Sequence, residues 1–461
     1  MVVGNAPEAA DMVVIGAGPG GYTAALHASK CGRDVTLIDR GGEQSIGGVC
    51  LHAGCIPSKS LIEAAGIFHR SQHSTAMGVN VTAASFNMTD FLEYKTSVIN
   101  KLAGGVHQKL KAAGVEVISG NATFTNEKTL VIETDEGYAR FVQFRDCVVA
   151  TGSSPVSVPG FDFNDRVLDA NATLCLDKIP ESIAIIGAGY IGLELGCALA
   201  KLGTKVSVIE AEQRILPTMQ AGPDAVLQRS MEQLGVSFHT QCRANSYSNS
   251  SLTITDEENN ESQINAEYVL LAVGRTPNIK NLELDSAGIE TNNEGLIEVG
   301  ADCRITTHIA AIGDITPGPA LAHKASGEAI VAVDALCGDT TAFEPQAIPL
   351  IIFTDPEIAL AGNSVEEAKA NGVNAQSHKL PVRASGRATT MDQTDGYVEL
   401  VSDGGDGTLL GATIVAPHAS ELIAEICIAI EMGASVEDVA LTIHPHPTLS
   451  ELVMDVAKLP F

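Results

Sequence analysis

The chain has 461 residues, a length typical of about three domains, and its 56 aspartates and glutamates against 28 lysines and arginines give a formal net charge of −28. So acidic a composition argues against nucleic acid or an anionic membrane as a partner. The N-terminus lacks the positively charged region of a signal peptide and no apolar run is long enough to span a bilayer, so we expect a cytoplasmic protein without a membrane segment.

A glycine-rich motif, Gly16-Ala-Gly-Pro-Gly-Gly21, follows the predicted strand 12–15 and precedes the predicted helix 22–30. A second predicted strand, 35–38, ends in Asp39, eighteen residues after the last glycine. In a dinucleotide-binding βαβ unit, such glycines admit a pyrophosphate to the helix N-terminus and the carboxylate accepts hydrogen bonds from ribose hydroxyls. The alternative is a glycine turn used for packing alone. We predict a dinucleotide site that includes Gly16, Gly18, Gly21 and Asp39.

Cys50 and Cys55 stand five residues apart, immediately before a helical pattern. Pro57 suits the first turn of a helix, which puts Cys55 at a helix N-terminus, where a thiolate is favoured. Five residues of regular helix rise roughly 7.5 Å, too far for a disulfide, so we expect a distortion near Gly54. We predict a redox pair. The alternatives are two unpaired buried cysteines or half of a zinc site, but the other eight cysteines form no second close pair, and we expect no metal site.

The βαβ pattern recurs in the middle of the chain. A predicted strand, 183–186, leads into Gly187-Ala-Gly-Tyr-Ile-Gly192, and the strand 205–209 ends in Glu210, again eighteen residues after the last glycine. A carboxylate at this position pairs with a free ribose 2′-hydroxyl and repels a 2′-phosphate. No cation stands between Glu210 and Arg214. We therefore predict an NAD site rather than an NADP site, with contacts from Gly187, Gly189, Gly192 and Glu210.

Three shorter signals join a strand to a turn: 147–150 before Gly152, 269–273 before Gly274, and 309–312 before Asp314. The first two are interpreted as strands that close each nucleotide domain. Asp314 either holds a further cofactor hydroxyl or forms an ordinary turn. From Phe343 the pattern changes to mixed strands and helices, which predicts a separate α+β domain.

This last domain carries His446, whose backbone is restricted by Pro445 and Pro447. Thr448 is predicted to cap the next helix in a capping box with Glu451. In the functional interpretation, His446 is a general base that Glu451 orients. In the alternative, His446 is a loop histidine and Glu451 has only its helical role.

The two βαβ units, Gly-Gly-Val-Cys-Leu-His-Ala-Gly-Cys-Ile-Pro-Ser-Lys at 47–59, Ala-Ile-Gly-Asp at 311–314 and His-Pro-Thr-Leu-Ser-Glu at 446–451 together resemble the FAD-dependent pyridine nucleotide-disulfide oxidoreductases, the lipoyl branch more than the glutathione branch. The resemblance runs nearly end to end. It implies an α/β fold with two Rossmann-like FAD/NAD-binding domains followed by an α+β C-terminal dimerisation domain. The implied divisions are an FAD-binding domain at 1–152, an NAD-binding domain at 153–276, a central domain at 277–344 and an interface domain at 345–461.

The resemblance also implies residue roles. Cys50 is the interchange thiol that meets the substrate, Cys55 is the charge-transfer thiolate beside the flavin, and Lys59 and Glu194 form an ion pair near the flavin's reactive nitrogen. The active site is shared, with His446 coming from the partner subunit of a homodimer. The implied catalytic residues are therefore Cys50, Cys55, Lys59, Glu194, His446 and Glu451. The implied FAD and NAD contacts outside the glycine motifs are Lys59, Gly152, Gly274, Asp314 (to the ribityl chain) and Ala322.

The implied reaction oxidises protein-bound dihydrolipoyl groups and passes two electrons through the cysteine pair and FAD to NAD. The expected partner is a lipoyl-bearing acyltransferase or a glycine-cleavage carrier protein, and the sequence does not choose between them. The main alternative is a small-molecule disulfide reductase of the same family. A mercuric reductase would be expected to carry a C-terminal cysteine pair, yet no cysteine follows Cys427. A non-catalytic nucleotide-binding sensor would not need the intact cysteines, ion pair and histidine.

Two further expectations concern backbone and charge. By resemblance, the His446–Pro447 and Asp355–Pro356 peptides are predicted to be cis. His52 departs from the asparagine common in the family segment, without an expected change of reaction. Because acidic surfaces are a device of halophiles, we predict a salt-rich cytoplasm; the alternative is an ordinary acidic cytosolic enzyme.

Overall fold

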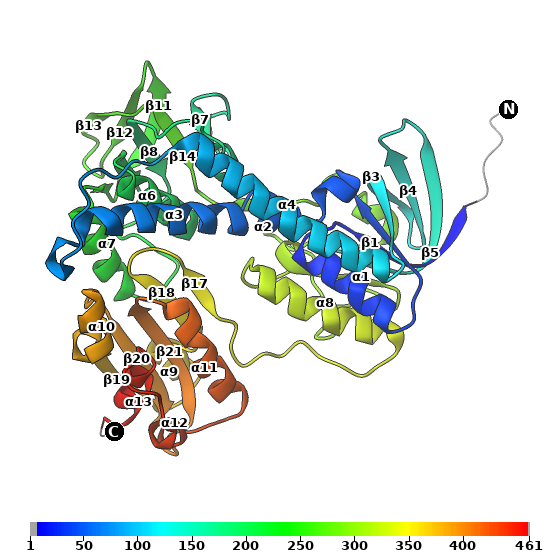
Figure 1. Cartoon of the computed structure of the whole chain (residues 1–461). Coiled ribbons are helices and arrows are strands. Elements are labelled where there is room, and N and C mark those ends of the chain that lie inside the picture. Colours follow the sequence, from blue (N-terminus) through cyan, green and yellow to red (C-terminus); the bar gives the residue numbers. More distant parts are fainter. Residues whose placement is uncertain (1–6, 460–461) are drawn as a thin grey trace. The chain divides into compact units, whose positions relative to one another are not determined.

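The structure, a computed structural model, describes residues 7–459, which divide into two compact units (Figure 1). Unit 1 combines the chain up to Ser60 with Thr89–Val156 and Gly274–Glu344; unit 2 combines Leu61–Met88, Ser157–Val273 and the chain from Pro345. The α/β class is confirmed, whereas the division into four domains stays a prediction. Among the described helices, none combines the length and apolar character that a bilayer span requires.

Unit 1 is built on a six-stranded sheet in which β1 pairs in parallel with both β2 and β5, and β16 extends the sheet beyond β5. The middle strands β3 and β4 form antiparallel pairs. The strands are β1 (Glu8–Ile15), β2 (Val35–Asp39), β3 (Glu116–Asn126), β4 (Thr129–Thr134), β5 (Ala139–Val149) and β16 (Ile309–Ala311), with a separate antiparallel pair of β6 (Ser153–Pro155) and β15 (Arg275–Pro277).

The two faces of this sheet bury alternate residues of each strand. Val14 and Val148 face helices α1 and α8, while Val13 and Cys147 belong to the cluster on the other face. This alternation is the period of two that a strand imposes on its side chains. The helices of unit 1 are α1 (Pro19–Lys30), α2 (Gly48–His52), the start of α3 (Cys55–His73), α4 (Met88–Ala112) and α8 (Ala322–Cys337).

Unit 2 contains a five-stranded parallel sheet in the order β10-β9-β8-β14-β7. Helix α6 follows β8 and buries nearly its whole length. The strands and helices of this part are β7 (Val167–Leu168), α5 (Ala170–Leu174), β8 (Ser182–Ile186), α6 (Tyr190–Lys201), β9 (Lys205–Ile209), α7 (Pro223–Gln233), β10 (Ser237–His239) and β14 (Tyr268–Leu271), beside an antiparallel sheet of β11 (Arg243–Ser248), β12 (Ser251–Thr255) and β13 (Glu261–Asn265).

The C-terminal part of unit 2 is a five-stranded antiparallel sheet in the order β17-β18-β21-β20-β19, packed against α11 and α13. It confirms the α+β character predicted after Phe343. Its elements are β17 (Leu350–Ile352), β18 (Glu357–Gly362), α9 (Val365–Ala370), β19 (Ala375–Pro381), α10 (Gly386–Met391), β20 (Tyr397–Asp403), β21 (Leu409–Ala416), α11 (Ala419–Glu431), α12 (Val436–Leu441) and α13 (Glu451–Ala457).

Candidate active site

The first glycine motif forms the turn between β1 and α1. Gly16 has a φ of +102°, and a Cβ there would lie 2.3 Å from the carbonyl oxygen of Ala150. A Cβ on Gly21 would lie 1.7 Å from the Gly16 carbonyl oxygen. Packing therefore requires glycine at both ends of the motif. Gly18 is different, because its φ is −68° and a Cβ there would meet nothing within 4 Å.

The second motif repeats this geometry between β8 and α6. Gly187 has a φ of +98° and a Cβ there would lie 2.6 Å from the Ala272 carbonyl oxygen, whereas a Cβ on Gly189 would have its nearest neighbour 4.0 Å away. Neither strain nor packing explains the middle glycines, Gly18 and Gly189. An approaching pyrophosphate does explain them, because the second glycine of this fingerprint lets the phosphates come close to the backbone. The residues present therefore fit a dinucleotide at each motif.

The carboxylate after each second strand is engaged with its own glycine loop. Asp39 Oδ2 accepts a hydrogen bond of 2.8 Å from the Ala17 N–H, and Glu210 Oε2 accepts one of 2.7 Å from the Ala188 N–H. Each carboxylate thus fixes the loop that we expect to hold the phosphates. Contact with the ribose hydroxyls stays a prediction for both.

Arg214, the first cation after Glu210, is occupied. Its guanidinium donates to the carbonyls of Leu216 and Pro217 at 3.3 Å and lies 3.5 Å from Asp224. A cation held in this way is poorly placed to bind a 2′-phosphate, which agrees with a preference for NAD.

Asp314 belongs to a polar network at the end of β16. The hydroxyl of Ser153 donates to Asp314 Oδ2 at 2.5 Å and accepts from Arg275 Nε at 2.7 Å. Arg275 also donates to the Ser153 carbonyl at 2.5 Å. Gly152 and Gly274 were predicted as site residues from the sequence. Their neighbours Ser153 and Arg275, which orient the carboxylate, were not predicted, because their partners lie more than a hundred residues away in the chain.

The cysteine segment is attached to the first glycine motif. The Gly47 N–H donates to the Ala17 carbonyl at 2.8 Å, and a Cβ on Gly48 would lie 2.7 Å from the Gly18 Cα. Cys50 lies on α2, and Cys55 is the first residue of α3, as predicted. The break at residues 53–54 between the two helices is the predicted distortion. The candidate redox pair therefore lies beside the candidate dinucleotide loop.

The two thiols interact strongly. The pKa of Cys50 is raised, first by a hydrogen bond to Cys55, then by burial and by negative charge on Cys55. Cys50 therefore holds its proton more tightly than an ordinary thiol, and a helix N-terminus favours the negative charge on Cys55. The pKa of Tyr22 on α1 is also raised, first by burial and then by the charges of both cysteines. Tyr22 was not predicted as a site residue; its place directly after Gly21 is the feature that could have indicated it.

Two histidines near the motifs have structural partners. His52 Nε2 lies 2.9 Å from the Ile46 carbonyl oxygen, so this ring holds the loop that precedes Cys50. His444 Nε2 lies 2.6 Å from Glu425 Oε1, and its side chain is only 4% exposed. Both roles are compatible with an unchanged reaction.

His446 and Glu451 form the predicted pair. Nδ1 of His446 lies 2.9 Å from Oε1 of Glu451, and the His446 side chain is 81% exposed, so its other nitrogen is open to a partner. The pKa of Glu451 is lowered, first by the Thr448 N–H, which donates to Oε2 at 2.9 Å, and then by His446. The His446–Pro447 and Asp355–Pro356 peptides are both cis, as predicted.

The predicted cap at Thr448 is wrong. Helix α13 begins at Glu451 with Ser450 as its N-cap, and the Thr448 hydroxyl donates to the Pro445 carbonyl at 2.7 Å instead. Only the half of the capping box in which Glu451 accepts from the Thr448 N–H is formed. The reason is that a tight turn over residues 445–450 separates Thr448 from the helix, so its hydroxyl has a nearer acceptor.

The remaining predicted site residues lie on three different helices. Glu194 lies on α6, is 3% exposed, and its Oε1 accepts from the Phe353 N–H at 2.9 Å. Lys59 lies on α3, where its charge lowers the pKa of Cys50 as a minor contribution. Ala322 is the first residue of α8. Lys59 and Glu194 belong to different units, so their ion pair stays a prediction.

Comparisons with known proteins agree with this geometry. The family model described as pyridine nucleotide-disulphide oxidoreductase matches residues 10–329, and that of the dimerisation domain of the same family matches residues 348–457. The dihydrolipoyl dehydrogenase of Geobacillus stearothermophilus is 42% identical over all of this chain and 98% of its own length. That of Halobacterium salinarum is 43% identical over 99% of this chain and 98% of its own length. Among solved structures, LpdA from Mycobacterium tuberculosis superposes with a TM-score of 0.89 at 26% identity, over 97% of this chain and 99% of that one.

Proposed function

From the premise that the chain belongs to the pyridine nucleotide-disulphide oxidoreductase family, we propose that it is a dihydrolipoyl dehydrogenase, which oxidises protein-bound dihydrolipoyl groups with NAD⁺. The observation that carries the proposal is the attachment of the Cys50–Cys55 segment to the first glycine loop, through Gly47 and Gly48. Two interacting thiols beside a dinucleotide loop can exchange electrons with a bound flavin. Relatives similar over their full length bear the name of this activity.

The enzyme is FAD-dependent and NAD-linked, like its family. FAD would be held by the loop from Gly16 to Gly21, by Asp39 and by Asp314, and when bound it supplies the two-electron carrier between the cysteine pair and the nicotinamide. NAD would be held by the loop from Gly187 to Gly192 and by Glu210. The chain itself supplies the thiol chemistry and the proton transfers.

The thiol chemistry starts with the oxidised Cys50–Cys55 disulfide. His446 of the partner subunit removes a proton from a dihydrolipoyl thiol, and the resulting thiolate attacks Cys50 Sγ, so Cys55 leaves as a thiolate. The second dihydrolipoyl thiol then displaces Cys50 from the mixed disulfide and closes the lipoyl ring. The lowered pKa of Glu451 keeps that carboxylate ionised, so it stabilises the imidazolium that His446 becomes. The pair Lys59 and Glu194 is proposed to fix charge near the flavin.

A homodimer is part of the proposal, because the chain carries the dimerisation domain of the family and His446 is exposed within its own chain. We further propose a cytoplasmic location and a lipoyl-bearing acyltransferase or glycine-cleavage carrier as partner. The lipoyl arm would reach the cysteine pair.

The middle glycines offer a matched pair of variants. Gly18→Ala has room for its methyl group in the protein, so we expect a folded protein that loses most of its FAD during purification. Gly189→Ala should keep FAD but raise KM for NAD⁺ about 10- to 100-fold, because crowding a well-fitted contact costs roughly 1–3 kcal/mol. Flavin content and NAD⁺ kinetics of the two variants check this. Normal FAD content in Gly18→Ala would contradict the assignment of the first motif.

From the net charge, we propose that activity and dimer formation depend on salt. A formal net charge of −28 implies self-repulsion, which salt screens as the Debye length falls from about 10 Å at 0.1 M to about 3 Å at 1 M. We expect activity and dimer to be lost in low salt and restored above about 1 M potassium chloride. Thermal unfolding in a potassium chloride series tests this. A midpoint that does not move between about 0.1 M and 2 M would refute the halophilic proposal and leave the activity untouched.

The substrate assignment is tested by steady-state kinetics. Dihydrolipoamide with NAD⁺ should be turned over with a far higher kcat/KM than glutathione disulfide or other small disulfides with NADH or NADPH. A preference for a small disulfide would make the protein a disulfide reductase of the same fold. Absence of any turnover would favour a nucleotide-binding sensor.

A further inference from the structure

Helices α1 and α8 of unit 1 run side by side in the same direction (Figure 1). Near their N-terminal ends, a Cβ on Gly20 would lie 3.2 Å from the Cβ of Ala325, and the Thr23 and Ser326 hydroxyls are 3.4 Å apart. Further along, His27 of α1 meets Asp334 of α8. The helices therefore stay in contact from the glycine loop to their C-terminal ends.

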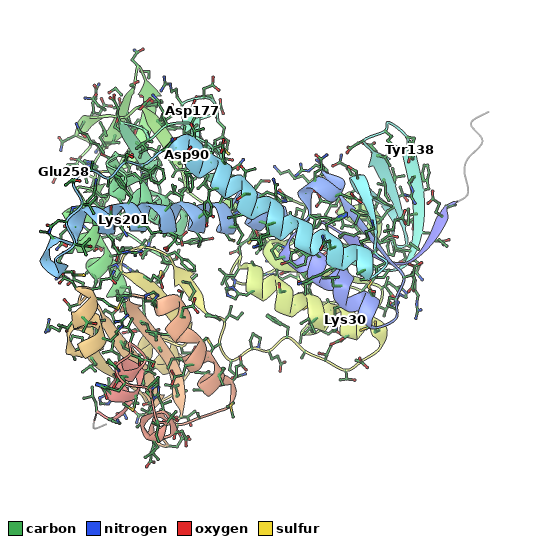
Figure 2. All side chains as sticks on the ribbon, in the orientation of Figure 1. Lys30, Asp90, Tyr138, Asp177, Lys201 and Glu258 are labelled. Carbon is green, nitrogen blue, oxygen red and sulfur yellow. The ribbon has the colours of Figure 1, made fainter. Side chains whose placement is uncertain are left out.

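At those C-terminal ends, three side chains of metal-ligand type converge. His27, Cys31 and Asp334 place one ligand atom each within 4.8 Å of the others. Cys337, the last residue of α8, lies near Cys31, because its charge contributes, after burial, to the raised pKa of Cys31. Both cysteines are exposed and both are free. Lys30, labelled in Figure 2, is the last residue of α1 and lies next to Cys31 in the chain.

We propose that His27, Cys31, Asp334 and Cys337 form a zinc-binding site that links the C-terminal ends of α1 and α8. The spacing is suitable on both helices, because residues four apart on α1 and three apart on α8 each share one helix face. Two sulfurs, one imidazole nitrogen and one carboxylate oxygen are a donor set that tetrahedral Zn²⁺ accepts.

The ligand atoms of His27, Cys31 and Asp334 are close enough to one another for one metal ion, and the Cys337 side chain would turn toward them. His27 Nε2 lies 2.6 Å from Asp334 Oδ1. Around a tetrahedral Zn²⁺ neighbouring ligand atoms lie roughly 3–4 Å apart, given bonds of about 2.0–2.3 Å. A metal ion bound between His27 and Asp334 would move these two atoms apart by about 1 Å. The side chains are about one-quarter exposed, so an ion can reach them from solvent.

Charge near the cluster is also suitable. Two thiolates and a carboxylate around Zn²⁺ leave one negative charge. Arg33 Nη1 lies 3.8 Å from Cys337 Sγ and can donate a hydrogen bond to that sulfur. The Arg33 guanidinium is itself fixed by Asp11 at 2.7 Å and by Asp146 at 2.6 Å, so it stands ready without reorganisation.

This site is separate from the redox pair. Cys31 lies eleven residues beyond Gly20 along α1, a rise of roughly 16 Å. We expected no metal site from the sequence, because the cysteines other than Cys50 and Cys55 form no close pair; the four proposed ligands come in two pairs about three hundred residues apart. Bound zinc would tie together the far ends of the two helices whose near ends hold the first glycine loop.

The test uses FAD-loaded protein in which Cys50→Ser and Cys55→Ser remove the redox pair, which would otherwise compete for the metal. After reduction and removal of the reductant, Co²⁺ is titrated in as a visible probe. We expect one Co²⁺ per chain, with the strong ligand-field absorption of a tetrahedral thiolate site to the red of the flavin, and displacement by Zn²⁺. Saturating Zn²⁺ should raise the unfolding temperature.

Variants of the cluster make the test decisive. Adding Cys31→Ser and Cys337→Ser should abolish the cobalt spectrum and the thermal shift. Because loss of even an outer-shell partner costs 10–100-fold in affinity, His27→Asn should weaken Co²⁺ binding by roughly 100-fold or more. Cys175→Ser, an exposed cysteine outside the cluster, is the matched control and should behave like its parent.

Three results would overturn the proposal. The first is a cobalt spectrum unchanged by Cys31→Ser and Cys337→Ser. The second is a weak six-coordinate spectrum in the parent protein, as expected if His27 and Asp334 form only an ion pair. The third is a Cys31–Cys337 disulfide that resists the reductant, seen by mass spectrometry of alkylated protein, because the pair would then be a covalent link. Flavin content shows whether each variant is folded. If the Cys31→Ser, Cys337→Ser variant loses its flavin, the Co²⁺ affinity of His27→Asn alone tests the proposal.

Discussion

Cys55→Ser should abolish the long-wavelength absorption band that the yellow holoenzyme shows when dihydrolipoamide reduces it without oxygen. Cys50→Ser should instead show such a band with no reductant at all. The reason is the position of the two thiols: the pKa of Cys50 is raised, whereas Cys55 stands at the start of α3, where a helix N-terminus favours a thiolate. With Cys50 gone, Cys55 cannot enter the disulfide and stays a thiolate beside the oxidised flavin.

Both variants should lack dihydrolipoamide turnover, so the spectrum rather than activity separates their roles. Anaerobic absorption spectra at several pH values measure the band and the thiol that gives rise to it. Cys175→Ser is the control for loss of a cysteine as such. Equal spectra in Cys50→Ser and Cys55→Ser would contradict the assigned roles.

His446→Gln should slow dihydrolipoamide oxidation by about 10²–10⁴-fold, the usual contribution of a general base. Reduction of the flavin by NADH should be nearly unchanged, because that half-reaction needs no proton from the substrate thiol. Rapid-mixing measurements of the two half-reactions check the difference. Losses of equal size in both would remove His446 from its proposed role.

Glu451→Gln is the companion variant. It keeps an acceptor for the Thr448 N–H, which now holds Oε2 at 2.9 Å, but it removes the negative charge next to His446 Nδ1. We expect an intermediate loss in the thiol half-reaction and a histidine that gains its proton less readily. A pH profile identical to that of the wild type would show that Glu451 only supports the turn.

The elements of the site could be predicted from sequence where the cause is local. The glycine motifs, the helix start at Cys55 and the distortion between the cysteines follow from backbone rules that act over a few residues. The pair His446 and Glu451, five residues apart, is also local. The prediction that Thr448 caps the next helix was wrong although the cause is local. Thr448 and Ser450 lie two residues apart, and the turn between them determines which of the two is the N-cap.

The rest depends on contacts between distant segments. Gly48 is needed because α2 begins against Gly18, and Arg275 matters because it reaches Ser153. The four residues proposed to bind zinc meet only because α1 packs along α8. A single sequence does not indicate which distant residues will be in contact. The resemblance to the family predicted the contacts that family members share, and the structure was needed to find the other contacts.

We propose that thiol oxidation and NADH formation are coupled through one cysteine pair on each chain. It is tested most directly by mixing the FAD-loaded enzyme without oxygen with excess NAD⁺ and one equivalent of dihydrolipoamide per chain, and by counting NADH and lipoamide. We expect equal amounts of both, about one per chain, and none of either in Cys50→Ser. NADH formed without lipoamide, or lipoamide formed at the wild-type rate by Cys50→Ser, would contradict it.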